Sequence, residues 1–191
     1  MIKTPTEYKE MEFIELFIAL AKLFKPKVYV ELGTKKGYTI KRIAPFVEKA
    51  IGIDINPQKL DLLPPNVEII KSTTLEYVES LKGREPFIDI LFIDANHSKE
   101  AVMEDFIKYL PYVKTGTGLI LMHDTHPINI ELTRDGYCNN AWEAAADIYN
   151  LSLALNVEII TLPGPWAGLS ILRKRGDHHL SWKSQEVMDG I

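Results

Sequence analysis

The sequence predicts an open α/β fold built on a doubly wound, mostly parallel sheet. Segments with the pattern of helices alternate with short β-rich runs along almost the whole chain, and no internal repeat interrupts them. The first β-rich runs are apolar at successive positions, as is typical of parallel strands that are buried on both faces. The last two runs flank a turn rich in proline and glycine, so we expect the sheet to end in a hairpin.

Seven segments have the composition of strands, and the first five fit right-handed crossover connections. The expected strands are Lys27–Leu32, Ala50–Ile55, Val67–Lys71, Phe87–Asp94, Gly118–His123, Val157–Leu162 and Leu169–Arg173. A loop, Asp124–Asn140, follows the fifth strand. The hairpin turn is Pro163–Gly168.

The first helix is expected over about residues 4–24. Thr4-Pro5-Thr6-Glu7 has the form of a capping box with proline in the first helical position, and apolar residues then recur on one helical face from Ile14 to Phe24. The other expected helices are Gly37–Val47, Pro57–Leu62, Thr73–Leu81, Ser98–Leu110 and 141–150. The polar tail, 176–191, fits either a frayed end or a short docked helix.

Composition limits the class of protein. The chain has 191 residues, of which 46% are hydrophobic, and this indicates a single domain over 1–191. Its 22 basic and 26 acidic residues give a net charge of −4, which argues against nucleic acid as a partner. A short basic run at 173–175 is the one contrary feature, and such runs are usually solvated. The single cysteine, Cys138, the absence of a signal peptide and the absence of a long apolar segment favour a cytoplasmic protein without membrane contact.

Ligands of doubly wound sheets bind at the carboxyl ends of the strands. The first strand ends in a turn that contains Gly33 and Gly37, where a ligand could approach the backbone at a helix N-terminus. The second strand ends at Asp54, whose carboxylate could accept hydrogen bonds from ribose hydroxyls. A tight strand-to-helix turn and an aspartate that caps a turn are the purely structural alternatives.

Glu31, Asp54 and Asp94 would give this edge of the sheet an acidic rim. Such a rim would repel a pyrophosphate and stabilise the ammonium and sulfonium charges of S-adenosylmethionine, although Lys35 and Lys36 could pair with phosphate instead. An NAD-dependent oxidoreductase is therefore one alternative, and the missing third glycine opposes it. A binding protein without catalysis is the other alternative.

Three motifs resemble those of class I S-adenosylmethionine-dependent methyltransferases. They are the run Val30–Thr39, the acidic end of the second strand at Asp54, and Phe92–Ser98. More narrowly, Asp94-x-x-His97-Ser98 followed by His123-Asp124-Thr125 is similar to the branch that contains macrocin O-methyltransferase and the cephalosporin-biosynthesis methyltransferases. The resemblance implies a Rossmann-like, seven-stranded sheet of order 3-2-1-4-5-7-6 with the last strand antiparallel.

The resemblance also implies a set of cofactor-binding residues. These are Glu31, Gly33 and Gly37 around the methionine part, Asp54 at the ribose, Ile55 at the adenine, and Asp94 beside the reacting methyl group. The sequence departs from the family after the third strand, where a common acidic residue is replaced by Lys71-Ser72-Thr73. Contact with the adenine is therefore expected from Ser72 and Thr73, through their hydroxyls or backbone.

Asp94 and Asp124 end neighbouring strands, so their carboxylates are expected to converge. Mutual repulsion would then favour a raised pKa or a bound cation. The resemblance implies a magnesium ion here. At position 123 the branch often has another acidic residue, whereas this sequence has His123. The imidazole would favour manganese or another metal that accepts imidazole ligands, or it would leave the site empty. Capping roles for both aspartates are the alternative.

The predicted reaction is methyl transfer to a hydroxyl of a small-molecule acceptor, with assistance from a divalent metal. His97 and His126 are the candidate general bases, because imidazole titrates near neutral pH. Trp142 and Trp166 could cover the acceptor, although aromatic residues in such places more often serve packing. The leading helix could form a homodimer contact or a lid.

Overall fold

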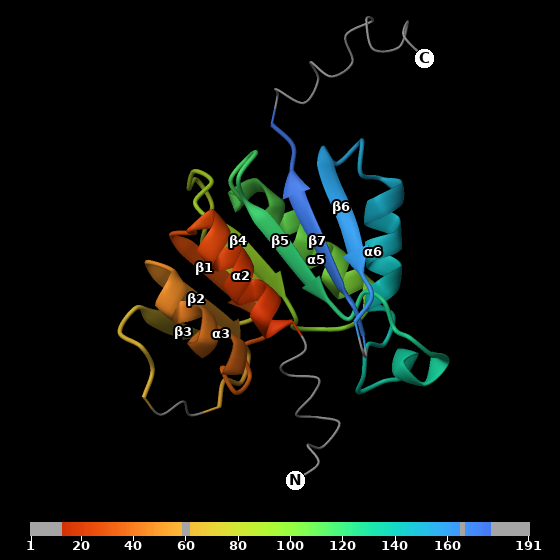
Figure 1. The fold of residues 1–191 in the computed structure, drawn as a ribbon, viewed down its shortest axis with the longest axis horizontal. Helices are drawn as coiled ribbons and strands as arrows, with labels where there is room; N and C mark the ends of the chain where they lie inside the picture. The colour runs from red at the N-terminus through yellow and green to blue at the C-terminus, as the bar shows by residue number, and fades with distance from the viewer. Residues whose placement is uncertain (1–12, 59–61, 165–166, 177–191) are drawn as a thin grey trace, which may run out of the picture.

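The computed structural model describes residues 13–58, 62–164 and 167–176. They form a seven-stranded sheet of order β3-β2-β1-β4-β5-β7-β6, with helices on both faces (Figure 1). The doubly wound class is the one that the sequence pattern predicts, and the strand order is the one that the family resemblance implies. The strands are β1 (Val28–Leu32), β2 (Lys49–Asp54), β3 (Val67–Lys71), β4 (Ile90–Ile93), β5 (Leu119–His123), β6 (Val157–Leu162) and β7 (Leu169–Lys174).

The strands β1 to β5 are parallel, and β1 lies between β2 and β4. The last strand, β7, inserts between β5 and β6 and runs antiparallel to both. The order therefore reverses between β1 and β4, whose carboxyl ends lie side by side with that of β5. This is the place in a doubly wound sheet where a ligand is expected.

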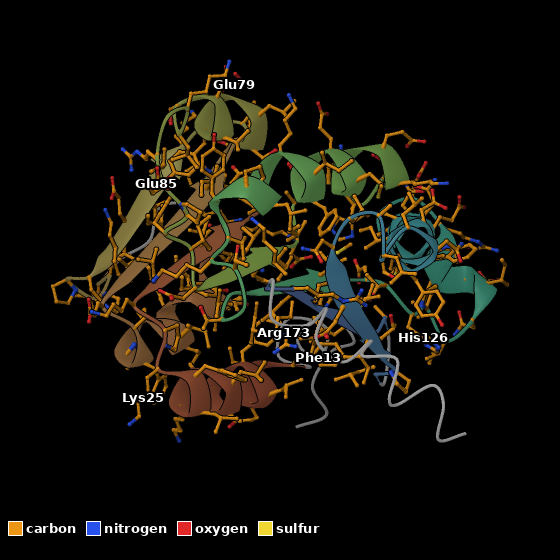
Figure 2. The ribbon with its side chains drawn as sticks, turned by 90° about the horizontal axis from the view of Figure 1, so that it is seen from above. Phe13, Lys25, Glu79, Glu85, His126 and Arg173 are labelled. Carbon is orange, nitrogen blue, oxygen red and sulfur yellow. The ribbon has the colours of Figure 1, made fainter. Side chains whose placement is uncertain are left out.

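Helices cover the sheet in two layers, visible edge-on in Figure 2. The helices are α2 (Ile14–Phe24), α3 (Tyr38–Ile43), α4 (Thr74–Glu79), α5 (Lys99–Tyr109) and α6 (Ala141–Asn150). Apolar side chains of α2 and α3 pack with one set of strand residues, and those of α4, α5 and α6 pack with the other. Because side chains alternate along a strand, Tyr29 of β1 faces α2 and α3 whereas Val30 faces the opposite core.

Two expected elements differ from the sequence prediction. No helix is present at the described residues 57, 58 and 62 of the expected helix Pro57–Leu62, because the Gln58 N–H donates to the carbonyl of Lys35 instead of entering a helical turn. The fourth strand begins at Ile90 rather than Phe87. The N–H groups of Phe87 and Ile88 donate to the Tyr112 carbonyl, away from the neighbouring strands.

Three short 3₁₀ turns complete the fold: η1 (Ala44–Phe46), η2 (Leu110–Tyr112) and η3 (Ile130–Thr133). The last of these gives local structure to the segment expected as the loop Asp124–Asn140. The predicted capping box at 4–7, Trp166 and residues 177–191 lie outside the described residues. Among the described helices, none is both long enough and apolar enough to cross a membrane.

Candidate functional site

A cavity of about 390 Å³ opens at the carboxyl ends of β1, β2 and β4. It contains six of the residues predicted from the sequence: Glu31, Gly33, Asp54, Asp94, His97 and His123. The other lining residues come mainly from the turn after β1 and from the start of α2: Phe13, Ile14, Phe17, Thr34, Lys35, Lys36, Tyr38, Thr39, Phe92, Ala95 and Gly136. The pocket thus combines an acidic floor, an apolar wall and a basic rim.

The turn after β1 needs both of its glycines for backbone reasons. Gly33 has a φ of +89°, and a Cβ at this position would overlap the carbonyl oxygen of Asp94. Gly37 has a φ of +67° and precedes the first residue of α3, and its N–H donates to the Thr34 carbonyl at 2.7 Å. The close approach of β1 to the end of β4 explains Gly33. Gly37 lies outside the pocket lining.

Asp54 is held rigidly at the end of β2. Its Oδ2 accepts a hydrogen bond from the Lys35 N–H and its Oδ1 accepts one from the Asn56 N–H, each at 2.7 Å. A carboxylate has about four acceptor positions, so both oxygens keep a further lone pair for a ligand hydroxyl. The carboxylate is thus fixed beside the glycine turn and open to the pocket.

Glu31 is a buried acid in the floor of the pocket. Only 2% of its surface is exposed, and its Oε2 accepts a hydrogen bond of 2.8 Å from the Tyr29 hydroxyl. Burial raises the pKa of Glu31 to about 8, the Tyr29 hydrogen bond opposes this rise, and the nearby charges of Asp94 and Asp54 add to it. A cation bound in the pocket would therefore stabilise the ionised form of Glu31.

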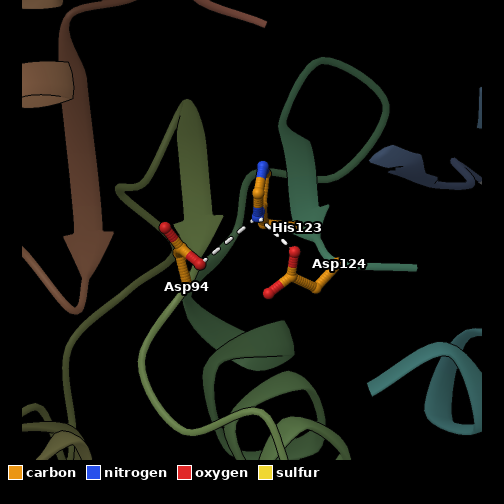
Figure 3. A group of neighbouring side chains, drawn as sticks. All are labelled: Asp94, His123 and Asp124. Atoms are coloured by element: carbon orange, nitrogen blue, oxygen red, sulfur yellow. Dashed lines mark ion pairs between the residues drawn. The ribbon is translucent and has the colours of Figure 1, made fainter. Parts of the chain in front are cut away.

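Asp94, His123 and Asp124 converge as the sequence predicts (Figure 3). His123 Nδ1 lies 3.5 Å from Asp94 Oδ1 and 3.0 Å from Asp124 Oδ1. His97 joins the group from the other side, with its Nδ1 against Asp124 Oδ2 and its Nε2 3.8 Å from Asp94 Oδ1. Two imidazoles therefore flank the two oxygens of Asp124.

Asp124 is the most constrained member of this group. It is 1% exposed, has a φ of +61° and has the Cys138 thiol 3.5 Å from its Oδ1. Burial raises the pKa of Asp124, but hydrogen bonds from His123 and His97, together with the charges of these imidazoles, outweigh that effect and hold the pKa well below its usual range. Asp124 is thus an ionised carboxylate beneath the pocket, where it can orient both histidines.

Aromatic rings form the wall beside this acidic group. The Phe13 ring meets the His123 ring edge to face at 5.9 Å, and the Phe92 ring meets it at 6.2 Å. Phe17 packs on Phe92 at 4.9 Å. Figure 2 labels Phe13 at the start of α2, which therefore supplies one side of the pocket.

The structure places several predicted residues outside the pocket lining. Ile55 is 68% exposed, and Trp142 and His126 are also exposed. The hydroxyls of Ser72 and Thr73 form hydrogen bonds within their own turn, where Thr73 caps α4 together with Glu76. The roles of these residues in adenine binding, acceptor cover and base catalysis remain predictions.

The sequence did not single out the pocket roles of Phe13, Ile14 and Phe17, or the contacts of Tyr29 and Cys138. A signal existed for Tyr29, because residues two apart on a strand share a face and Tyr29 precedes Glu31 by two. The contact between Cys138 and Asp124 depends on the path of a long loop, which local patterns do not predict.

Residues 30–125 match the family described as a methyltransferase domain. The chain belongs to this family of methyltransferase domains. The matched region contains every strand end that faces the cavity, from Glu31 to His123. No curated protein sequence matches the chain.

Solved structures of methyltransferases share the fold. The O-methyltransferase TomG of Streptomyces achromogenes, in complex with SAM, superimposes with a TM-score of 0.62 at 19% identity, over 92% of this chain and 82% of TomG. An O-methyltransferase from Bacillus cereus in complex with SAH gives a TM-score of 0.61 at 18% identity, over 90% of this chain and 81% of the other. A spermidine synthase also matches, with a TM-score of 0.59 at 19% identity, over 89% and 61%. The fold therefore does not by itself specify the group that is transferred.

Proposed function

We propose that this methyltransferase domain transfers a methyl group from S-adenosylmethionine to a hydroxyl of a small molecule, with a divalent cation bound by Asp94, His123 and Asp124. The observation that carries the proposal is one pocket whose lining combines an acidic strand edge beside the glycine turn with Asp94 and His123, two members of an Asp/His/Asp group whose third member, Asp124, is buried behind the lining. Resemblance to the macrocin and cephalosporin branch, and the SAM and SAH complexes of the two O-methyltransferases, support the choice of cofactor and reaction.

The acidic residues fit a cationic cofactor. S-adenosylmethionine supplies a methyl group that is already activated on a sulfonium centre. We assign Asp54 to the ribose hydroxyls, since both of its oxygens are fixed and retain acceptor capacity. Glu31 and Gly33 lie between Asp54 and Asp94, and we assign them to the methionine part of the cofactor. Asp94 then lies beside the transferred methyl group.

The Asp94, His123 and Asp124 group fits a divalent cation. Each residue offers one ligand atom, and these atoms all lie within 4.8 Å of one another. A set of two carboxylates and one imidazole suits manganese and related transition metals better than magnesium, which prefers oxygen ligands. Such a cation, when bound, orients an acceptor hydroxyl and lowers its pKa.

His97 is the better placed of the two candidate bases. Its Nδ1 faces Asp124, which favours the tautomer with the proton on Nδ1 and leaves Nε2 free to accept a proton on the pocket side. His126 lies outside the pocket lining, and its backbone N–H is bound to the Ala167 carbonyl. We therefore assign proton acceptance to His97 Nε2.

The wall of the pocket restricts the acceptor. Phe13, Ile14, Phe17 and Phe92 give it an apolar side next to His123. Apolar surface buried against such a wall contributes about 25 cal/mol per Å² to binding. We propose an acceptor that presents one hydroxyl to the acidic group and an apolar body to α2.

Calorimetry on the full chain tests the proposal. We expect saturable binding of S-adenosylmethionine and no binding of NAD at the same concentration. With manganese present, an acceptor panel of small hydroxylated molecules should reveal methyl transfer that stops on chelation. Failure to bind S-adenosylmethionine, or tighter binding of NAD, would contradict the cofactor assignment. Full activity after exhaustive chelation would contradict the metal.

A further inference from the structure

Tyr29 and Glu31 form a buried pair on one face of β1. Both side chains point toward the core beneath α2 and α3, because they are two residues apart on the same strand. The phenol oxygen of Tyr29 lies 2.8 Å from Glu31 Oε2 and donates the hydrogen bond. Tyr29 is 1% exposed, so it does not line the cavity and reaches the pocket only through Glu31.

This hydrogen bond is the one polar contact of the Glu31 side chain within the part of the chain that the structure describes. The charged groups near Glu31 are the carboxylates of Asp94 and Asp54, which repel it. No described lysine or arginine forms an ion pair with it. The direction of the Glu31 carboxylate is therefore set by Tyr29, which holds Oε2 and leaves Oε1 for the pocket.

A phenylalanine ring could fill the same space in the core as the Tyr29 ring, so packing alone does not explain the Tyr29 hydroxyl. The ring lies among apolar side chains, including Phe17, Ile40 and Ile43. Burying a hydroxyl costs free energy unless the hydroxyl forms a hydrogen bond. The Tyr29 hydroxyl forms its hydrogen bond with Glu31, the buried acid of the pocket. Burial, followed by the charge of Glu31, raises the pKa of Tyr29 well above its usual range, so the phenol keeps its proton and remains a donor.

We propose that Tyr29 is a positioning residue that holds the Glu31 carboxylate toward the amino-acid part of the cofactor. This inference rests on the proposed function, because it takes the cofactor to be S-adenosylmethionine. A carboxylate that is already oriented loses less conformational freedom when the ligand ammonium binds, which strengthens binding. Tyr29 therefore contributes to cofactor affinity without touching the cofactor.

The test compares Tyr29→Phe with the wild-type protein by calorimetry, with two probes. S-adenosylhomocysteine carries the amino-acid part and 5′-methylthioadenosine lacks it. Loss of a hydrogen bond to a charged group should weaken S-adenosylhomocysteine binding about tenfold, while 5′-methylthioadenosine binding stays within about twofold. A purely structural loss would weaken both probes alike.

Tyr109→Phe is the matched control. It removes another buried tyrosine hydroxyl, one that donates to the Thr74 carbonyl at 2.7 Å on the opposite face of the sheet. We expect both affinities of this control to equal those of the wild-type protein. Equal loss of S-adenosylhomocysteine binding in the two variants would overturn the inference.

Glu31→Asp keeps the test decisive if Tyr29→Phe does not fold. The shorter side chain keeps the charge but withdraws the carboxylate from Tyr29. It should therefore weaken binding of S-adenosylhomocysteine more than binding of 5′-methylthioadenosine, as Tyr29→Phe does. If Glu31→Asp, or a Tyr29→Phe variant that folds, binds S-adenosylhomocysteine as tightly as the wild-type protein does, this inference is overturned. The proposed function would still stand. If the wild-type protein binds neither S-adenosylmethionine nor S-adenosylhomocysteine, the proposed function fails and the inference fails with it.

Discussion

Replacing Glu31 by glutamine is expected to stabilise the ligand-free protein in alkaline solution while it weakens cofactor binding. The folded state holds the Glu31 proton more tightly than the unfolded state, since the pKa rises from 4.5 to about 8 on folding. The resulting stabilisation is complete below pH 4.5 and is lost as the pH rises through 8. Ionisation of this one buried group would thus remove about 5 kcal/mol from the free energy of unfolding.

Urea unfolding at a series of pH values measures this effect. Between about pH 6.5 and pH 9.5 the wild-type free energy of unfolding should fall by about 2 kcal/mol more than that of Glu31→Gln. Glutamine keeps an acceptor oxygen for Tyr29, so the core packing is matched. Parallel stability profiles for the two proteins over this range would refute the reasoning, because the buried acid would then carry no raised pKa.

Four further results are expected. Asp54→Ala should weaken S-adenosylmethionine binding about a hundredfold in calorimetry, since two charge-assisted hydrogen bonds to the ribose are lost; unchanged affinity would exclude the ribose assignment. Gly33→Ala should lower the free energy of unfolding by about 2 kcal/mol or more, as its Cβ would overlap the Asp94 backbone at a positive φ. Manganese at about a hundred times its Kd should stabilise the wild-type protein by about 2.7 kcal/mol in thermal unfolding and leave Asp124→Asn unchanged. The wild-type protein should lose stability as the pH rises from 3.8 to about 6, because burial raises the pKa of Asp105 to about 6 and the folded state keeps a proton that the unfolded state has already lost. Asp105→Asn should abolish this loss, and an unaltered profile between these pH values would contradict the reasoning.

The sequence was sufficient to predict the sheet and the acidic end of the pocket. Alternating helices and doubly buried strands predict a doubly wound sheet, the family resemblance implies its strand order, and adjacent parallel strands bring their ends to one edge. Asp94 and Asp124 could therefore be placed together although they lie thirty positions apart in the chain, and His123 came with them. Asp54 could be placed beside the glycine turn by the same argument.

Contacts that depend on how a helix packs on the sheet, or on the path of a loop, could not be predicted in this way. The aromatic wall requires the start of α2 to reach β4, and the apolar periodicity from Ile14 to Phe24 indicates only that one face of the helix is buried. Thr73 was predicted near the adenine, yet its hydroxyl caps α4, a local use that competes with ligand contact. The position of His97 against Asp124 depends on the turn before α5, whose geometry the residues alone do not specify.

The pocket wall and the pocket floor are built from separate parts of the fold. Glu31 and Asp54 belong to strands that are hydrogen-bonded to their neighbours, and Asp94 directly follows β4, with its N–H bound to the Leu32 carbonyl. Ile14 and Phe17, by contrast, belong to a helix that packs on the sheet through side chains, and Phe13 directly precedes that helix. Substitutions on α2 can therefore reshape the wall without disturbing a single backbone hydrogen bond of the sheet. If the proposed function holds, acceptor preference could be redesigned through substitutions on α2 while the acidic edge of the sheet is left unchanged.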